Sequence, residues 1–492
     1  MLKHVLLYTA MSVATLSAGA ESVVSTPGNL HTLVSNPATT TELTLSGSIN
    51  AADLDFIDTE MTALQTLDLS AVEIVAYSGA RLRGSSTHAA ATIPARCFVG
   101  SPITSLTLPG SELLSIGEAA FAGAAIKSLT LGANVVSMGT GAFSGCTDLA
   151  TVTISADALA EGAFSGCTAL TTVSFTTDVA LPDYAFSDCT ALATVNGSNK
   201  LYTIGNHAFA NTGALSAVAF GSDLTAIGDE AFLQSGITDI DLSPCADLNS
   251  VGERAFAQMP ALKSIDLGNA VTVGAGVVFD CPALEQVKYS TRATVVPDYA
   301  YSKDAALDTV GIFTDNISEI GAYALSGLSQ VTTITLPSSL TFIGDHAMEN
   351  MTGLQTINIA ITTAPATGEA VWSGVNQAEV ALIVPAEAYD SYTSADQWRD
   401  FDVRKPSGIA DTATDSATLR VRFDGDMLII DFGSIAASTV ALYDITGAKL
   451  CADTPVVEQQ AAVSTANIAV NQPFIVVAAT PEGLLTLKIA KQ

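Results

Sequence analysis

The sequence predicts a repeat solenoid with a parallel β-sheet along one face, followed by a small, sandwich-like all-β domain. Two features of the middle of the chain point to the solenoid: a recurring motif, and a short stretch of alternating apolar and polar residues about six residues after each copy, as in Leu262–Leu267. Period-two segments that recur at a fixed interval predict stacked parallel strands. Near Lys405 the pattern gives way to a different series of short strand-like segments, which predicts the second domain. The clearest copies of the motif are Ile116–Phe121, Ile204–Phe209, Ile227–Phe232 and Val251–Phe256.

A large apolar residue marks the same position in every repeat. It recurs twelve times between residues 98 and 348, with a mean spacing of about 22.7 residues. This spacing lies within the range of roughly 20 to 29 residues of leucine-rich repeats. We therefore expect about 12 leucine-rich repeats of 22–23 residues. The positions are Phe98, Phe121, Phe143, Phe164, Phe186, Phe209, Phe232, Phe256, Phe279, Tyr301, Leu325 and Met348.

Each repeat combines a turn with a strand. The glycine of the motif, as in Gly117, suits a turn that needs a positive φ, and the alanine beside each phenylalanine leaves room for the neighbouring repeat. Alternating β-branched residues such as Val152 and Ile154 predict a strand with one apolar face. Since one repeat cannot bury its own apolar side chains, the copies are expected to stack with strands about 4.8 Å apart.

The ends of the chain differ from its middle. A basic start, an apolar run from Val5 to Leu16 and small residues ending at Ala20 predict a cleaved secretory signal. Atypical segments are expected to cap the solenoid, and a polar stretch after Pro406 predicts a linker. The predicted divisions are residues 1–20 as signal peptide, 21–90 as N-terminal cap region, 91–360 as repeat array, 361–405 as C-terminal cap, 406–417 as linker and 418–492 as a β-sandwich-like sorting or anchoring domain.

The charge of the chain argues against nucleic acid as a partner. With 19 basic and 49 acidic residues, the formal net charge is −30, which repels phosphate backbones and anionic lipid headgroups. After the signal, no segment is long and apolar enough to span a bilayer, so no transmembrane segment is expected in the mature chain.

The seven cysteines are an odd number for an exported chain. Cys146, Cys167, Cys189 and Cys281 each lie three residues before a repeat leucine, where other copies carry threonine or methionine. This placement favours small, buried, free thiols. Stacked disulfides or a metal site are the alternatives, although no Cys-x-x-Cys pair occurs.

Groups that could perform catalysis are scarce, so the sequence predicts a protein that is not an enzyme. No His-Glu-x-x-His, Gly-x-Ser-x-Gly or phosphate-binding loop motif occurs. His207 and His346 share one repeat position, two residues before the large apolar residue. We expect this variable position to face solvent, with a ligand-binding ridge as the alternative. Other copies carry Tyr184, Glu230, Arg254, Tyr299 and Tyr323 there.

Neither a metal nor a cofactor is predicted. Two acidic pairs, Asp53 with Asp55 and Asp424 with Asp426, lack the full ligand spacing of a calcium loop. They are expected to lie on a helix surface and in a hairpin turn.

The outward positions of the strands offer the better binding surface. They form two columns rich in threonine, which strand propensity alone can explain. A group of charged residues interrupts these columns near the middle of the array, and charges on a broad sheet suit recognition of a protein or glycan. The predicted ligand-binding residues are Thr130, Thr153, Thr172, Asp239, Asp241, Asp266 and Lys288.

The Ile-Gly-x-x-Ala-Phe turn followed by a Leu-x-x-Ile-x-Leu strand resembles the BspA-type leucine-rich repeats over residues 41–405. Residues 384–392 with Trp398–Phe401 also resemble the usual ending of that family's arrays. The resemblance implies an exported or surface protein of a host-associated bacterium, and several members of the family are adhesins for host proteins.

The segment Leu442–Gly447 and the terminal hairpin resemble the C-terminal sorting domain of the type IX secretion pathway. The resemblance implies secretion, or attachment through this domain to the outer surface of a Gram-negative bacterium. Asn471–Phe474 stands where that family usually has Gly-x-Tyr, so a degenerate stalk or anchor of the same fold is the competing interpretation.

Together these features predict an adhesin-like binding protein that recognises a host extracellular protein or a glycan through the sheet face. A structural surface or spacer protein without a specific ligand is the alternative. Adsorption to ice is disfavoured, because charged and bulky residues interrupt the Ser/Thr-x-Thr stretches at residues 105, 128 and 151.

Overall fold

The computed structural model divides into two compact units, residues 1–404 and 405–492. In the first unit it describes residues 19–404 apart from 111, 157, 305 and 309–312. In the second it describes residues 420–490 apart from 425–426, 433–436, 445–448, 452–453, 458–459, 466–472 and 481–482. Nearly all of the predicted signal peptide therefore lies outside the described residues.

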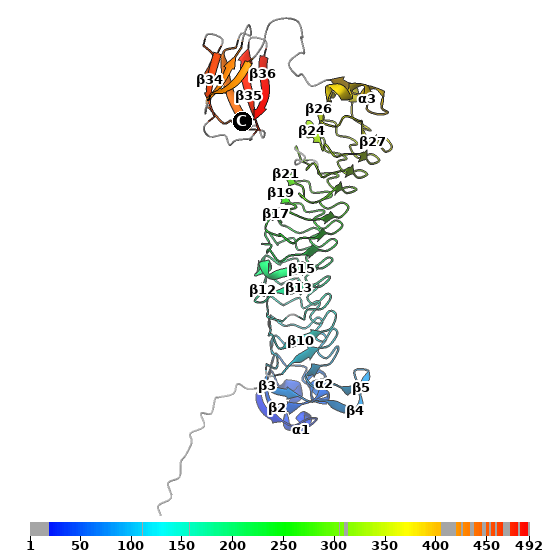
Figure 1. Ribbon diagram of the computed structural model, residues 1–492. Helices are drawn as coiled ribbons and strands as arrows, with labels where there is room; N and C mark the ends of the chain where they lie inside the picture. The colour runs from blue at the N-terminus through cyan, green and yellow to red at the C-terminus, as the bar shows by residue number, and fades with distance from the viewer. Residues whose placement is uncertain are drawn as a thin grey trace, which may run out of the picture. The chain divides into compact units, whose positions relative to one another are not determined.

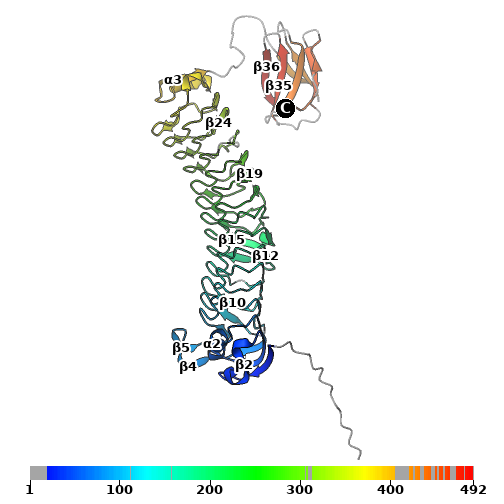
Figure 2. The same ribbon diagram turned by 180° about the vertical axis from the view of Figure 1, so that it is seen from behind.

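The first unit is an elongated parallel β-solenoid of about 16 turns with little helix, which confirms the predicted fold class (Figure 1). Its N-terminal end contains three parallel strands and three helical segments before the regular turns begin. The β4–β5 hairpin projects from this end beside α2 (Figures 1 and 2). The elements are β1 (Ala20–Ser25), α1 (Leu30–Leu33), η1 (Pro37–Thr39), β2 (Glu42–Ile49), α2 (Ala51–Glu60), β3 (Thr66–Ile74), β4 (Tyr77–Leu82) and β5 (Ser85–His88).

Asp53 caps α2 and so explains one of the acidic pairs. Its carboxylate accepts hydrogen bonds from the backbone N–H groups of Gly28, Leu30 and Asn50 at 2.7–2.9 Å. Asn50 accepts in turn from Ala52 N–H, which completes a capping box at the start of the helix. Asp55 lies 3.1 Å from the Arg83 guanidinium. Both carboxylates therefore have structural partners on the helix, but the prediction of a surface position was wrong for Asp53, which is buried where it caps the helix. Asp424 is the last described residue before the hairpin turn that was expected for the other pair. The rest of that turn, including Asp426, lies outside the described residues.

The front face of the solenoid is a series of parallel strands, one to most turns. Val152 pairs with Leu129 on one side and with Val173 on the other, so apolar residues stack inward in register. The series forms an eight-stranded sheet (β1-β2-β3-β7-β9-β11-β12-β14), a three-stranded sheet (β17-β19-β21) and a four-stranded sheet (β24-β26-β28-β29). Its array strands are β7 (Ser105–Thr107), β9 (Ser128–Leu131), β11 (Thr151–Ile154), β12 (Thr172–Phe175), β14 (Thr194–Asn196), β17 (Asp239–Asp241), β19 (Ser264–Asp266), β21 (Gln286–Lys288), β24 (Thr333–Leu336) and β26 (Thr356–Ile359).

A second series of parallel strands forms where only a turn was predicted. The apolar residue before each motif glycine ends a short strand; for example, Ile204 pairs with Ile227, and Ile227 with Val251. The apolar side chains before the glycines, such as Ile204, Ile227 and Val251, are buried, so both series of strands contribute to one core. The strands are β6 (Thr92–Ile93), β8 (Leu114–Ile116), β10 (Val135–Met138), β13 (Val179–Leu181), β15 (Leu201–Ile204), β16 (Ala226–Ile227), β18 (Ser250–Val251), β20 (Thr272–Val273), β22 (Val295–Val296), β23 (Glu319–Ile320), β25 (Phe342–Ile343) and β27 (Ala366–Thr367). Between β14 and β15 lies the short η2 (Ser198–Lys200).

The motif glycines serve close packing rather than a positive φ, so that part of the sequence interpretation was wrong. Gly117 and Gly252 have no positive φ, whereas Ala119 and Arg254, two residues later, have φ of 48° and 51°. A Cβ atom at Gly117 would lie 2.3 Å from the backbone nitrogen of Ala95 in the preceding turn. Any larger residue would therefore push two turns apart.

Asparagine and aspartate side chains that follow the motif glycine, or the Pro182 that replaces it, join successive turns. Asp183 Oδ1 accepts a hydrogen bond from Asn206 N–H, Asn206 Oδ1 from Asp229 N–H, and Asp229 Oδ1 from Glu253 N–H, each at 2.7 Å. We call these side chains the Asx ladder. The ladder supplies acceptors for backbone donors that the short strands leave unpaired.

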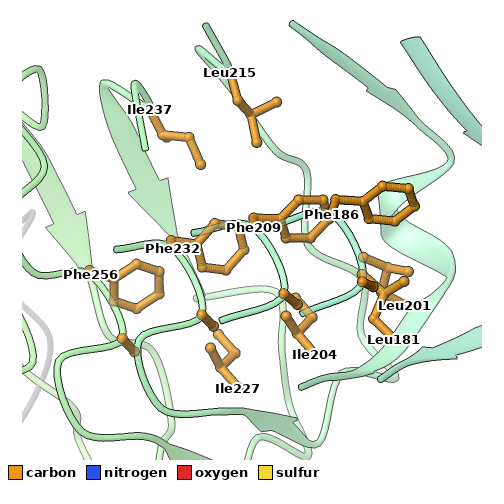
Figure 3. Packing of buried hydrophobic residues seen from close by; sticks show 14 of the residues in the cluster. Leu181, Phe186, Leu201, Ile204, Phe209, Leu215, Ile227, Phe232, Ile237 and Phe256 are labelled. Carbon is orange, nitrogen blue, oxygen red and sulfur yellow. The ribbon is translucent and has the colours of Figure 1, made fainter. Parts of the chain in front are cut away.

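The core of the turns from Phe98 to Phe256 contains a stack of phenylalanine rings, one per turn, and Figure 3 shows part of it. From Phe98 to Phe256 the neighbouring ring centroids lie 5.1–5.7 Å apart with interplanar angles of 0–15°. The predicted member Phe279 is an exception. The buried residue of its turn is Val278, whose N–H donates to Ala300 O, and Phe279 is only half-buried. The predicted position was therefore wrong by one residue.

All seven cysteines are free, and six of them are buried in the array. The Sγ atoms of Cys146, Cys167, Cys189 and Cys281 donate to phenylalanine carbonyl oxygens of the preceding turn at 3.1–3.3 Å. The expected packed thiols are confirmed. Cys451 in the second unit is partly exposed.

Aromatic side chains close the C-terminal end of the array. Trp372 and Trp398 contact each other edge to face, and Trp398 Nε1 donates to Pro365 O. Tyr392 and Phe401 pack against the same tryptophan. The last elements are η3 (Gln377–Glu379), β28 (Ala381–Ile383), η4 (Ala386–Ala388), α3 (Tyr389–Ser394) and β29 (Asp402–Arg404).

The second unit consists of two antiparallel sheets, β30-β31-β34 and β33-β32-β35-β36, around its own apolar cluster that includes Leu428, Leu442 and Phe474. Its strands are β30 (Arg420–Asp424), β31 (Met427–Asp431), β32 (Thr439–Asp444), β33 (Thr454–Pro455), β34 (Gln460–Ser464), β35 (Pro473–Thr480) and β36 (Gly483–Ala490). Across the described residues of both units, no helix has the length and apolarity needed to cross a membrane.

Candidate functional site

The predicted binding residues fall into two separate groups on the front face. Thr130 and Thr153 are neighbours in one outward column of the eight-stranded sheet, and Thr172 lies in the adjacent column, paired with Thr151 and Thr194. The charged residues lie in the sheet β17-β19-β21. Residues 215–220 form no strand between the two sheets. The structure therefore brings the threonines close to one another, and the charged residues close to one another, but not the two groups together.

The four charged residues form a compact cluster, which we call the acidic patch: Asp239, Asp241, Asp266 and Lys288. Asp241 pairs with Asp266 across the sheet, and Asp266 with Lys288. Lys288 Nζ donates to Asp266 Oδ2 at 2.7 Å, and this contact raises the pKa of the lysine. Ser264 Oγ donates to Asp239 Oδ1 at 2.5 Å, which holds the pKa of Asp239 below its ordinary value.

Two aspartates of the patch also have a local structural role. Asp241 Oδ1 accepts from Ser243 N–H at 2.9 Å, and Asp266 Oδ1 accepts from Gly268 N–H at 2.8 Å. Asp68, at the corresponding position of β3 and far from the patch, makes the same bond to Ser70 N–H at 2.9 Å. These side chains form Asx turns at strand ends. The turn requires a side-chain oxygen but not a negative charge.

The histidine and tyrosine position lies at the left-handed residue of each turn. This turn column has φ of 51–58° at residues that include His207, Arg254 and Tyr299. Left-handed backbone is disfavoured for bulky side chains, so large residues in this column are notable. The members with positive φ are Arg96, Ala119, Gly141, Gly162, Tyr184, His207, Glu230, Arg254, Gly276, Tyr299, Tyr323, His346 and Ala370.

The large side chains of the turn column contact one another along the array. Tyr184 stacks on His207 with ring centroids 4.7 Å apart, and Tyr323 stacks on both Tyr299 and His346 at 4.9–5.1 Å. His207 Nδ1 and Arg254 Nε both lie within 3.5 Å of Glu230 carboxylate oxygens. A ridge of aromatic and charged groups therefore follows the turns. The repeat spacing placed these residues in one column, but only the structure shows their contacts.

Between Arg254 and Tyr299 the turn column is interrupted by Gly276. A cavity of about 270 Å³ opens there, lined by Glu253, Arg254, Ala275, Gly276, Phe279 and Tyr299. Sequence reasoning missed this cavity, because Phe279 was placed in the core. Elsewhere, the described residues bring together no group of three or more His, Cys, Asp or Glu side chains that could hold a metal ion.

Comparison with known families is decisive for the fold. A family described as "BspA type Leucine rich repeat region" matches in six copies at residues 91–181, 179–308 and 298–378, which together cover more than half of the chain. The chain belongs to the BspA-type leucine-rich repeat family. None of the curated proteins compared with it matches.

Several solved structures are similar to parts of this chain. A leucine-rich repeat protein from Bacteroides ovatus is similar at 20% identity and a TM-score of 0.49, covering 75% of this chain and 84% of its own. A leucine-rich cell surface protein from Faecalibacterium prausnitzii has 21% identity and a TM-score of 0.29, covering 57% and 85%. The pneumococcal vaccine antigen PcpA has 14% identity and a TM-score of 0.25, covering 74% and 79%.

Proposed function

We propose that this BspA-type protein is an exported, non-enzymatic surface protein that binds a host extracellular protein or glycan through its front face. The observation that carries the proposal is the acidic patch. Asp239, Asp241 and Lys288 are exposed and held in register by a rigid parallel sheet. Fixed charges on a preformed surface give an interface specificity at little ordering cost.

A specific observation favours the alternative of a spacer without a ligand. Every carboxylate of the acidic patch already has a partner within the chain, since Asp239, Asp241 and Asp266 accept hydrogen bonds from Ser264, Ser243 and Gly268. A surface whose charged groups already have partners within the chain needs no ligand.

Asparagine substitutions separate the charge from the structural role. Asp241→Asn with Asp266→Asn removes two charges but keeps the oxygens that accept from Ser243 and Gly268. Asp68→Asn is the matched control, because Asp68 makes the same turn outside the acidic patch. The mature protein is first screened on arrays of host proteins and of glycans. The double variant is expected to lower affinity for the captured ligand by roughly tenfold or more, and the control to leave it unchanged.

If the wild-type protein binds nothing on either array, the spacer is favoured. Unchanged binding by the double variant would move the site away from the acidic patch.

Attachment through the second unit is a separate part of the proposal. Deletion of residues 412–492 should leave the array folded, because each turn of a solenoid contacts only its neighbours. Protease treatment of intact cells should then show loss of surface display. Display of the truncated protein would overturn the sorting role.

A further inference from the structure

We propose that the cavity at Gly276 is a binding subsite for one neutral sugar ring of a glycan. The cavity lies on the turn column and not on the front face, so this inference goes beyond the acidic patch. It exists because two departures from the repeat coincide in one turn. Gly276 leaves a gap where the neighbouring turns carry Arg254 and Tyr299, and Phe279 is displaced from the core into that gap.

The walls of the cavity are suited to a flat ring with apolar faces. The ring of Phe279 contacts Tyr299 edge to face, with centroids 6.4 Å apart, and Tyr299 is 43% exposed. A volume of about 270 Å³ accommodates one six-membered ring with its substituents. Aromatic side chains contribute large contact areas and face the C–H groups of a sugar with little loss of conformational entropy.

The charges around the Phe279 ring, which forms the aromatic floor of the cavity, determine which class of ligand the cavity suits. The Arg254 guanidinium lies 5.8 Å from the centre of the Phe279 ring, and Lys303 Nζ lies 5.0 Å from it. These two cations disfavour a cationic ligand. They do not favour an anionic one, because the Glu230 carboxylate is already paired with Arg254 and the Glu253 carboxylate lies at the rim, so two negative charges offset the two positive ones. A purely apolar side chain from a protein would cover these charges without pairing them, which is costly. A neutral sugar avoids both penalties.

Sugar hydroxyls also match the hydrogen-bonding groups at the rim. Arg254 can only donate and Glu253 can only accept, whereas a hydroxyl does both. Among the described residues, the Arg254 guanidinium makes an ion pair with Glu230 at 3.5 Å but no hydrogen bond, and the Glu253 carboxylate makes neither. Arg254 Nε is itself buried against Glu230, so the terminal N–H groups of Arg254 and the Glu253 carboxylate are the groups that remain for a ligand in the cavity.

The repeat itself provides matched variants. Gly276→Tyr places a side chain in the cavity at a backbone conformation that tyrosine adopts at Tyr299, where φ is 58° against 59° at Gly276. The new Cβ would lie 3.3 Å from Arg254 Cγ and from Phe279 Cβ, so both side chains must shift slightly. Gly162→Tyr introduces the same change at φ 61° in a turn where the residue corresponding to Phe279 is Ser165. Phe279→Ala removes the aromatic floor.

The test uses the mature full chain and a panel of neutral glycans, with methyl pyranosides as minimal probes, followed by ligand-detected NMR and calorimetry. We expect a neutral pyranoside to bind, with a loss of roughly tenfold or more in affinity for Gly276→Tyr and for Phe279→Ala, and no change for Gly162→Tyr. The acidic-patch double variant is expected to keep sugar binding.

Three outcomes would overturn the inference: no neutral glycan binds, Gly276→Tyr binds as well as the wild type, or only apolar peptides or charged sugars compete for the cavity. Loss of sugar binding in the acidic-patch variant alone would place the sugar on the front face. That result would support the proposed function while refuting this subsite.

Discussion

The thiol of Cys146 donates a hydrogen bond to the carbonyl oxygen of Phe121 in the preceding turn at 3.1 Å. The same contact recurs at Cys281, so cysteine is a structural residue of this solenoid. Burial raises the pKa of the thiols of Cys97 and Cys281, and that of Cys245 to about 11. Because the thiolate is the reactive form, these groups should be inert in the folded chain.

Thiol titration tests this directly. The native protein should react with a small disulfide reagent at about one site, Cys451, and at all seven sites once unfolded in denaturant. Cys451→Ser should remove the native reaction. Fast reaction of several thiols in the native state would contradict the packed arrangement.

Alanine substitution of a phenylalanine in the core stack should lower stability much more than alanine substitution of the displaced Phe279. Phe209→Ala opens a space within a continuous ring stack and is expected to lower the free energy of unfolding by about 3 to 5 kcal/mol. Phe279→Ala removes a half-buried ring outside the stack and is expected to cost less than about 1.5 kcal/mol. Denaturant unfolding of the full chain measures both. Equal losses in the free energy of unfolding would show that Phe279 belongs to the core.

This pair also shows what the sequence could and could not predict. Strand alternation and repeat spacing depend on the types of residue and can be recognised in the sequence. The inward stack and the outward columns could therefore be predicted. The three apolar residues 277–279 allowed two alignments of one turn. Val278 rather than Phe279 is buried because Gly276 has left-handed backbone and Val278 N–H donates to Ala300 O. Backbone conformation and backbone hydrogen bonds of this kind cannot be deduced from a pattern of apolar residues.

The candidate sites were predictable to the same limited extent. The spacing placed Asp241 beside Asp266, because register in a parallel solenoid follows the repeat. It could not reveal the cavity, which needs side chains from three successive turns and one missing side chain, that of Gly276. The second series of strands was also hidden, since segments such as β16 contain only two residues and show no alternation.

The Asx ladder predicts a sensitivity that the exposed position of Asp229 would not suggest. Asp229→Ala removes the acceptor for Glu253 N–H and should lower the free energy of unfolding by about 1 to 2 kcal/mol. Glu253→Ala is the matched control, because its backbone N–H remains and its side chain bridges no turn. Equilibrium unfolding compares the two. A loss for Glu253→Ala as large as that for Asp229→Ala would argue against the ladder.

Asp304 predicts an unusual dependence of stability on pH. It occupies the core position that holds cysteine in other turns, its Oδ1 accepts from Cys281 N–H at 2.7 Å, and its Oδ2 has no partner among the described residues. Burial raises the pKa of this carboxyl well above its ordinary value of 3.8. The folded chain therefore keeps a proton that the unfolded chain releases near pH 4. As pH rises from there toward the folded-state pKa, the unfolded state is increasingly favoured.

Asp304→Asn keeps an acceptor for Cys281 N–H and carries no charge. It should therefore remove the loss of stability that the wild type shows as pH rises. The variant is expected to equal the wild type near pH 4 and to exceed it by about 1 to 3 kcal/mol at pH 7. Thermal unfolding of the full chain between pH 4 and 7.5 measures the difference. Asp298→Asn is the control, since Asp298 is exposed and its oxygen accepts from Ala322 N–H in either form. Parallel pH curves for Asp304→Asn and the wild type would show that Asp304 is ionised in the folded core.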